Sequence, residues 1–506
     1  MSELHWTQVD GVTTVWAESQ GPLCCGLLFR AGRCDETLAA SGRTHLIEHM
    51  ALATIPDVER RHEGFVGALA TGFATMGRPE EVAAYLGSVC DALAALPSGR
   101  LEAEKSVLEA EAATRSPEVI GELLAWRYGA AGYGLIGMPE LGIASATLDE
   151  LQAYSAQRFT RENAVLWLSG PPPAGLRLPL PQGVRLPAPP LAPVLSTLPC
   201  WFTTDELGGV AVGATVPREP AVSLFCEIVN RRLRERLRTE RAVSYSPDVG
   251  YEPLDAETGH VILYADSGEE RRAELVSAFA DVLTGLDEVD DAEVETARKV
   301  LLDGWTGPLA PPPDVLVLQE LERAALDWIA GRAFEPMAAA AAEVAAVTTA
   351  EVVAFGELAL GNALFALSSD VDPAPCMGVR APLSHEAPVE GREAASADAP
   401  VVADRLVVGR DGVTVRGPDG LHATVRYAQL EAALSFRDGG VCLVGRDGTW
   451  LVIEPTLWRD GQRFCREIRE CVPVRLLLDQ GSRPAEAIPR PETTALQRLL
   501  FRLSGS

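Results

Sequence analysis

Short apolar runs and longer amphipathic runs alternate along the first third of this chain. Residues 12–30 form two apolar runs around the turn Ser19–Pro22, and 164–168 form another; short runs of this kind are typical of strands. Apolar residues that recur every three or four positions predict helices at 80–96, 100–115 and 148–159. Residues 173–200 are rich in Pro and Leu without periodicity, which is typical of a linker.

The same mixture of patterns restarts after this linker. Apolar runs predict strands at 210–216, 259–265 and 363–367. Amphipathic runs predict helices at 221–238, 271–286, 291–302 and 338–353. The chain has 506 residues, too many for one ordinary core. We therefore expect an α+β protein with two similar α/β sandwich domains, residues 1–172 and 201–372.

A different pattern follows a second linker, residues 373–400. Residues 401–486 contain short apolar runs separated by Gly- and Asp-rich turns, with a helix expected at 461–471 and a tail at 487–506. Strands followed by one helix resemble a pleckstrin-homology-like barrel. The arginines of this segment are dispersed among acids, so a structural or docking role is favoured over binding of phosphoinositide head groups.

The net charge and the cysteines indicate which binding partners and which cellular compartment to expect. The formal net charge of −27 argues against nucleic acids and anionic membranes as partners. The ten cysteines contain no Cys-x-x-Cys pair, which favours reduced thiols. The N-terminus lacks a basic segment followed by an apolar run, and no apolar run reaches about 18 residues. We expect a cytoplasmic protein without a membrane span.

The strongest chemical signal is the sequence His45-Leu46-Ile47-Glu48-His49. In a helix, His45 and His49 share a face one turn apart and can hold one Zn²⁺. Glu48 beside them can take a proton from water at the metal. This order, His-x-x-Glu-His, reverses the commoner His-Glu-x-x-His motif of zinc peptidases. The alternative is a helix with two histidines by chance, but the whole chain has only seven.

A catalytic zinc needs a third protein ligand. Glu104 and Glu111 are seven positions apart in a predicted helix and therefore lie on one face. We assign Glu111 as the third ligand and Glu104 as a carboxylate that orients a ligand histidine. The alternative is a solvated acidic face, which the His-x-x-Glu-His motif makes less attractive.

These motifs resemble the insulinase–pitrilysin family of zinc metallopeptidases. The matching features are Arg30–Arg33 after an apolar strand, the motif His45–His49, and the pair Glu104 and Glu111. Further matches are 137–140 and 148–166, and the resemblance covers about residues 5–370. It implies a zinc endopeptidase in which His45, His49 and Glu111 bind the metal and Glu48 is the catalytic base.

The second domain carries its own match, because the segment 237–245 resembles the family's Arg-x6-Tyr sequence. The resemblance implies that Arg238 and Tyr245 bind the substrate and stabilise its oxyanion. It also implies that two such domains form half of a closed chamber, as in the single-half, dimeric bacterial members. The resemblance allows a homodimer or a heterodimer with a paralogous subunit. It implies a short or unfolded peptide as substrate, for example a leader peptide.

Two departures from the family pattern qualify this interpretation. The interval between His49 and Glu111 is shorter than usual, and Gly67–Thr71 lacks the Asn that relatives carry in an edge strand. One alternative function is therefore a non-catalytic or regulatory subunit of a heterodimeric peptidase. Another is an adaptor that docks lipids or proteins through the C-terminal barrel.

Overall fold

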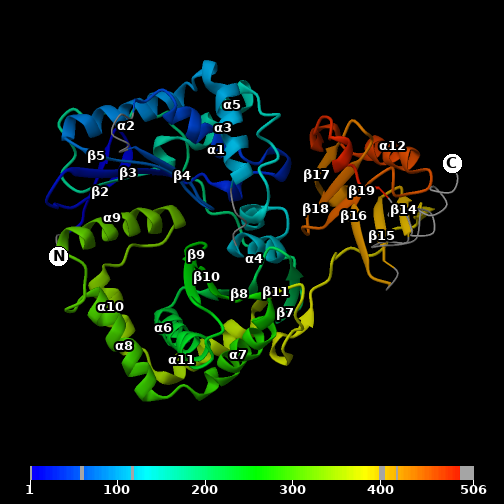
Figure 1. The fold of residues 1–506 in the computed structure, drawn as a ribbon. Coiled ribbons are helices and arrows are strands. Elements are labelled where there is room, and N and C mark those ends of the chain that lie inside the picture. Colours follow the sequence, from blue (N-terminus) through cyan, green and yellow to red (C-terminus); the bar gives the residue numbers. More distant parts are fainter. Residues whose placement is uncertain (1–2, 57–61, 115–118, 398–404, 418–419, 491–506) are drawn as a thin grey trace.

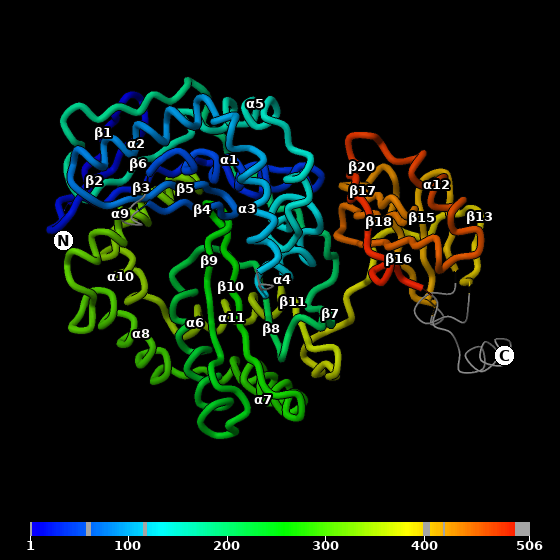
Figure 2. Tube along the Cα trace, turned by 45° about the horizontal axis from the view of Figure 1, so that its top comes forward, coloured from blue at the N-terminus to red at the C-terminus, as the bar shows by residue number. Residues whose placement is uncertain are grey.

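The structure is a computed structural model that describes residues 3–56, 62–114, 119–397, 405–417 and 420–490. Two α/β domains lie against each other, and a β-rich domain sits at the side of the first, as Figures 1 and 2 show from two directions. The mixture of helices and sheets agrees with the predicted α+β class.

A six-stranded sheet with the order β1-β2-β6-β3-β5-β4 forms the base of the first domain. Its strands are β1 (His5–Val9), β2 (Val12–Trp16), β3 (Leu23–Phe29), β4 (Glu63–Val66), β5 (Thr71–Gly77) and β6 (Ala164–Leu168). One face packs against α1 (Arg43–Leu52), α2 (Pro79–Ala94), α3 (Leu101–Thr114) and α5 (Leu148–Arg158). Apolar periodicity alone predicted the last three helices close to their observed ends.

The second domain repeats this topology. Its sheet has the order β12-β7-β11-β8-β10-β9. The neighbouring strands β7, β11, β8, β10 and β9 pair in the same parallel or antiparallel sense as β2, β6, β3, β5 and β4 of the first sheet. The strands are β7 (Cys200–Thr204), β8 (Gly209–Pro217), β9 (Asp248–Pro253), β10 (Thr258–Asp266), β11 (Ala363–Ser368) and β12 (Val379–Arg380). The helices packed in its core are α6 (Ala221–Leu233), α7 (Arg272–Thr284), α8 (Asp291–Trp305), α10 (Met337–Ala346) and α11 (Thr349–Gly361).

Each sheet has its other face covered by a helix from the opposite domain. Helix α9 (Pro313–Ala330) of the second domain contacts β2, β3 and β6, where Leu321 is buried with Val15. Helix α4 (Val119–Tyr128) of the first domain contacts β8 and β11, where Leu123 is buried with Leu364. Neither helix was predicted from the sequence. This exchange joins the two domains through their hydrophobic cores.

The C-terminal domain contains two four-stranded sheets. One contains β13 (Gly391–Ala395), β14 (Arg405–Gly409), β15 (Gly412–Arg416) and β16 (His422–Arg426); the other has the order β19-β18-β17-β20, from β17 (Leu430–Ser435), β18 (Val441–Gly445), β19 (Trp450–Ile453) and β20 (Leu477–Asp479). Helix α12 (Gly461–Cys471) buries Phe464 and Ile468 in their shared core. The domain is β-rich as predicted, but in the described residues neither sheet closes, so the pleckstrin-homology-like barrel is not shown.

Some predicted elements differ from those observed. The helix expected at 338–353 is divided into α10 and α11, because Thr348 caps the N-terminus of α11. The Thr348 hydroxyl accepts from Glu351 N, and the Glu351 carboxylate accepts from Thr348 N. The predicted helix 221–238 continues past α6 as a π-helical turn, Arg234–Glu240. The predicted linker 373–400 contains β12, which extends the second sheet, and β13, which pairs with β14.

None of the described helices is by itself long and apolar enough to cross a bilayer. Two sharply bent pairs, Pro79–Ala94 with Ser98–Thr114 and α10 with α11, reach that length and composition only when joined.

Candidate metal centre

The helix that carries the His-x-x-Glu-His motif begins at a tightly specified position. Gly42 precedes α1 in the left-handed region, with φ +87°, and a Cβ at this position would collide with Ile143 and Glu140. The buried Glu36 carboxylate accepts from the backbone N–H of Gly42 at 2.8 Å and of Thr44 at 2.7 Å. A negative charge that binds free N–H groups at a helix N-terminus stabilises the helix start.

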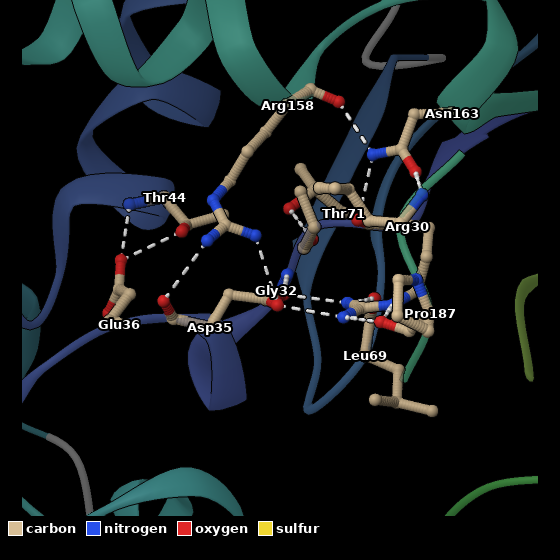
Figure 3. Close-up of polar contacts among 12 residues, drawn as sticks. Arg30, Gly32, Asp35, Glu36, Thr44, Leu69, Thr71, Arg158, Asn163 and Pro187 are labelled. Carbon is tan, nitrogen blue, oxygen red and sulfur yellow. Dashed lines mark hydrogen bonds and ion pairs between the residues drawn. The ribbon is translucent and has the colours of Figure 1, made fainter. Parts of the chain in front are cut away.

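The loop that leads into α1 is held by the buried charge network of Figure 3. Arg30 donates to both oxygens of Asp35, at 2.6 and 2.7 Å, and Arg158 lies 3.0 Å from the same carboxylate. Arg30 also donates to the carbonyl oxygens of Leu69 and Pro187. A planar guanidinium with this many partners fixes the direction in which the chain enters the helix.

Three potential metal ligands converge where α1 faces α3. Glu111 Oε2 lies 3.8 Å from Nε2 of His45 and 3.7 Å from Nε2 of His49. One donor atom from each of the three residues lies within 4.8 Å of the others. Ligand atoms on a tetrahedral zinc ion are roughly 3.4 Å apart, given bond lengths of about 2.1 Å. Two imidazoles and one carboxylate are also the donor types of a catalytic zinc site, so these residues fit the ion.

The other nitrogen of each imidazole is bound by a buried carboxylate. Glu140 Oε2 accepts from Nδ1 of His45 at 3.1 Å, and Glu104 Oε2 accepts from Nδ1 of His49 at 3.4 Å. Arg100 donates to the second oxygen of Glu104 at 2.6 Å. With the proton on Nδ1 in both rings, Nε2 is left as the ligand atom facing Glu111.

Glu48 has the position and acidity of a general base. Its side chain is buried beneath β4 and its Oε2 lies 3.7 Å from Nε2 of His49. Burial, together with the nearby charges of Glu111 and Glu104, raises the pKa of Glu48 to about 7, although His45 opposes the shift. A carboxylate with such a pKa can both accept and return a proton near neutral pH.

The two histidines differ in basicity. Burial acts to lower the pKa of His45, but the hydrogen bond and charge of Glu140 outweigh it, so the pKa of His45 is raised. The pKa of His49 is lowered by burial and by His45, despite Glu104. Neutral imidazole is the form that binds metal, so His49 is ready to bind over a wider pH range than His45.

The structure therefore brings together five of the predicted site residues, namely His45, Glu48, His49, Glu104 and Glu111. It does not bring Arg238 and Tyr245 to them. Those two residues pair with each other, with the guanidinium carbon 5.1 Å from the Tyr245 ring centroid. They line a hollow formed entirely by second-domain residues, and Tyr245 is 81% exposed. Within one chain these side chains face solvent rather than the metal centre.

The edge strand lies earlier in the chain than the resemblance implies. Gly67–Ala70 form the turn between β4 and β5, and the edge strand is β4, Glu63–Val66. The turn is fixed from outside, because the carbonyl oxygens of Gly67 and Ala68 accept from the N–H groups of Arg33 and Cys34. The segment that lacks the Asn therefore forms a turn and is not part of the open edge.

Three further residues of the site were not assigned from the sequence. Glu140 lies in the matching segment 137–140 and binds His45, Glu36 binds the start of α1, and Gly64 of β4 lies against the Glu48 carboxylate. Glu36 lies six residues before Gly42, across the short helix Leu38–Ala40, so no local helix-start signal identifies it. The contacts of Glu140 and Gly64 depend on tertiary structure alone.

No family model matches the sequence, and no curated protein sequence matches it. Solved structures do match the fold. A protease from Helicobacter pylori aligns with a TM-score of 0.60 at 13% identity, covering 74% of this chain and 100% of that one. The peptidase M16 inactive domain from Pseudomonas fluorescens aligns with a TM-score of 0.59 at 16% identity, covering 75% of this chain and 100% of that one.

A third similar structure is the first half of the periplasmic protease PqqL from Escherichia coli. Its TM-score is 0.57 at 12% identity, with 74% of this chain and 92% of that chain covered. Identities this low establish the fold and leave catalysis open, since both proteases and an inactive domain share it. The chain thus has the fold of M16-like peptidases, the insulinase–pitrilysin fold.

Proposed function

We propose that this protein is a zinc-dependent endopeptidase that cleaves short or unfolded peptides. The observation that supports it best is the convergence of His45, His49 and Glu111, with Glu48 beside them. An inactive domain of the same fold would have no need to keep three ligands, a buried base and a carboxylate on each imidazole. The M16-like fold of proteases with similar structures adds to this argument.

His45, His49 and Glu111 would hold the metal. Zinc bound there would lower the pKa of a water molecule and polarise the scissile carbonyl. Glu48 takes the proton from water at its carboxylate and returns it to the nitrogen of the departing amine. Its burial under β4 shields the carboxylate from bulk water while it carries the proton.

The open edge of the first sheet offers a place for the peptide. Strand β4 ends the sheet and pairs only with β5 among the described strands, so its outer edge can accept an extended chain. Glu48 lies directly behind Gly64 of this strand. A peptide added alongside β4 would therefore pass close to the base.

We further propose that the active form is a dimer, with Arg238 and Tyr245 of one subunit meeting the substrate at the metal centre of the other. Their exposure and their distance from the ligands within one chain support this arrangement. Complete PqqL aligns over 84% of this chain but only 56% of its own length. The FusC E83A mutant, crystallised with Arabidopsis ferredoxin, aligns over the same fractions with a TM-score of 0.54. Both are consistent with an assembly of two such halves, whether a homodimer or a heterodimer with a paralogue.

The alternative is a non-catalytic or regulatory subunit, and the inactive M16 domain of similar structure supports it. The cytoplasmic location and the processing of a leader peptide remain predictions, and one protein of similar structure is periplasmic.

The decisive experiment measures zinc content and hydrolysis of unfolded peptides by the purified chain. Wild type should bind zinc in a one-to-one ratio and lose activity to a chelator, and Glu48→Gln should keep the zinc and lose hydrolysis. A Glu102→Gln variant, which changes an exposed acid of α3, is the control and should behave as wild type. Undiminished hydrolysis by Glu48→Gln would exclude this residue as the base, and a wild type without zinc would exclude the metal centre.

A further inference from the structure

The C-terminal domain touches the first domain through an apolar cluster. Leu38, Leu135 and Met138 of the first domain pack against Leu434, Val444 and Leu478 of the sheet β19-β18-β17-β20. All six are almost completely buried. Apolar side chains that become this buried between domains favour a fixed arrangement over free relative motion. We call these six residues the docking cluster.

The backbones of the first and C-terminal domains are also in direct contact at this interface. Ala130 N donates to the carbonyl oxygen of Arg446 at 2.9 Å. Its neighbour Gly129 has φ +71°, and a Cβ there would overlap the same carbonyl oxygen. Only glycine at 129 lets the β17–β18 sheet approach this closely.

The docking cluster lies on the segments that hold Glu140. Arg33 donates to the carbonyl oxygens of Leu135 and Met138, at 3.0 and 2.8 Å. The Ser41 hydroxyl donates to the carbonyl oxygen of Leu38 at 2.8 Å and accepts from Leu141 N at 2.9 Å. Glu140 is thus flanked on both sides by residues tied to the interface.

We propose that the C-terminal domain is a positioning element of the metal centre: its docking holds the 138–141 turn so that Glu140 stays bound to His45. The inference rests on the proposed zinc site. The domain presses on Leu135 and Met138, the turn places Glu140, and Glu140 fixes the tautomer and direction of the His45 ring. Undocking should therefore weaken zinc binding although no metal ligand changes.

The test uses the full chain with Gly129→Ala, which adds one methyl group at the interface. Gly132→Ala is the matched control, because Gly132 also has positive φ, +54°, but has open space around its missing Cβ. Leu434→Asp undocks the domain independently, from its own side. Zinc dissociation constants come from competition with a chromogenic chelator, and hydrogen–deuterium exchange of residues 138–142 is measured in metal-free protein.

Gly129→Ala and Leu434→Asp should each weaken zinc binding by about 10-fold or more, the usual effect of losing a carboxylate behind a ligand histidine. Exchange at 138–142 should accelerate, and Gly132→Ala should change neither. In a Glu140→Gln background, Gly129→Ala should add no further loss, because both changes act through one contact.

Wild-type zinc affinity in both undocked variants would overturn the proposal, and so would a loss that adds fully to that of Glu140→Gln. The exchange measurement needs no metal. It therefore separates a failure of this coupling from a failure of the zinc site itself.

Discussion

Gly64 in the edge strand lies so close to the carboxylate of Glu48 that no larger side chain fits between strand and base. The strand therefore determines where the carboxylate rests, and the carboxylate determines that position 64 is glycine. Two segments with separate proposed roles, the strand edge that would accept the peptide and the helix that carries the proposed base, meet at this contact.

Gly64→Ala should therefore displace Glu48 and lower kcat by about 100-fold or more, the scale expected for a misplaced general base. Zinc content should not change, because the atoms nearest to a Cβ at position 64 belong to Glu48 and Leu52 and not to a metal ligand. Gly67→Ala, three positions away with its nearest neighbour, Ala70 O, at 3.6 Å, is the control. Steady-state kinetics beside metal analysis decide the matter; equal kcat in the two variants would contradict the assigned contact.

A mixture of two inactive variants tests the dimeric chamber. Glu48→Gln removes the base and Arg238→Ala removes the substrate contact. In a homodimer whose sites combine both elements across the interface, random exchange of subunits restores about a quarter of wild-type activity. Each variant alone provides the baseline. If the mixture stays at that baseline while light scattering shows mixed dimers, the sites are not built across such an interface.

The charge network below α1 predicts a stability effect. Asp35→Asn leaves the buried guanidinium of Arg30 without its anion and should lower the free energy of unfolding by about 3–5 kcal/mol. Glu102→Gln breaks an ion pair whose carboxylate is 82% exposed and should have little effect. Urea denaturation followed by tryptophan fluorescence compares the two. Similar midpoints would mean that the buried network contributes little.

His260 predicts a pH effect in the second domain. It is fully buried in β10, with no hydrogen-bond partner at either ring nitrogen among the described residues, and burial together with Arg127 lowers its pKa to about 3. Below the ordinary pKa of about 6.5, the unfolded chain binds a proton that the folded chain does not. Stability should therefore fall as the pH falls from about 6.5 towards 3, by about 1.4 kcal/mol per pH unit from this residue.

The control variant for this effect is His260→Leu, which replaces the titrating group with an apolar side chain. Unfolding free energies measured at several pH values between about 6.5 and 5 give the two slopes. A wild-type slope no steeper than that of the variant would contradict the depressed pKa of His260.

Local patterns predicted the parts of the site that lie on single helices. His45, Glu48 and His49 are fixed by the pitch of α1, and Glu104 and Glu111 by that of α3, so spacing along the chain was enough. Glu140 comes from a turn 95 residues after His45, and only the folded chain shows the contact. Strands β4 and β5 were missed because glycines at 64 and 72 weaken their apolar alternation.

Long-range packing explains the remaining differences. Helices α4 and α9 each bury apolar side chains against the sheet of the opposite domain. Their own sequences do not indicate which surface they will contact. In the C-terminal domain, alternation predicted a run of short strands but missed β13, β17 and β20. It also did not predict how the strands divide into two sheets, which depends on pairing between distant segments.

The exchange of α4 and α9 means that neither α/β domain is complete without the other. Removing either one would expose the bare face of a sheet, so the Pro-rich segment between them does not act as a hinge. In the dimer that we propose, we therefore expect substrate to enter and leave by movement between subunits rather than between these two domains.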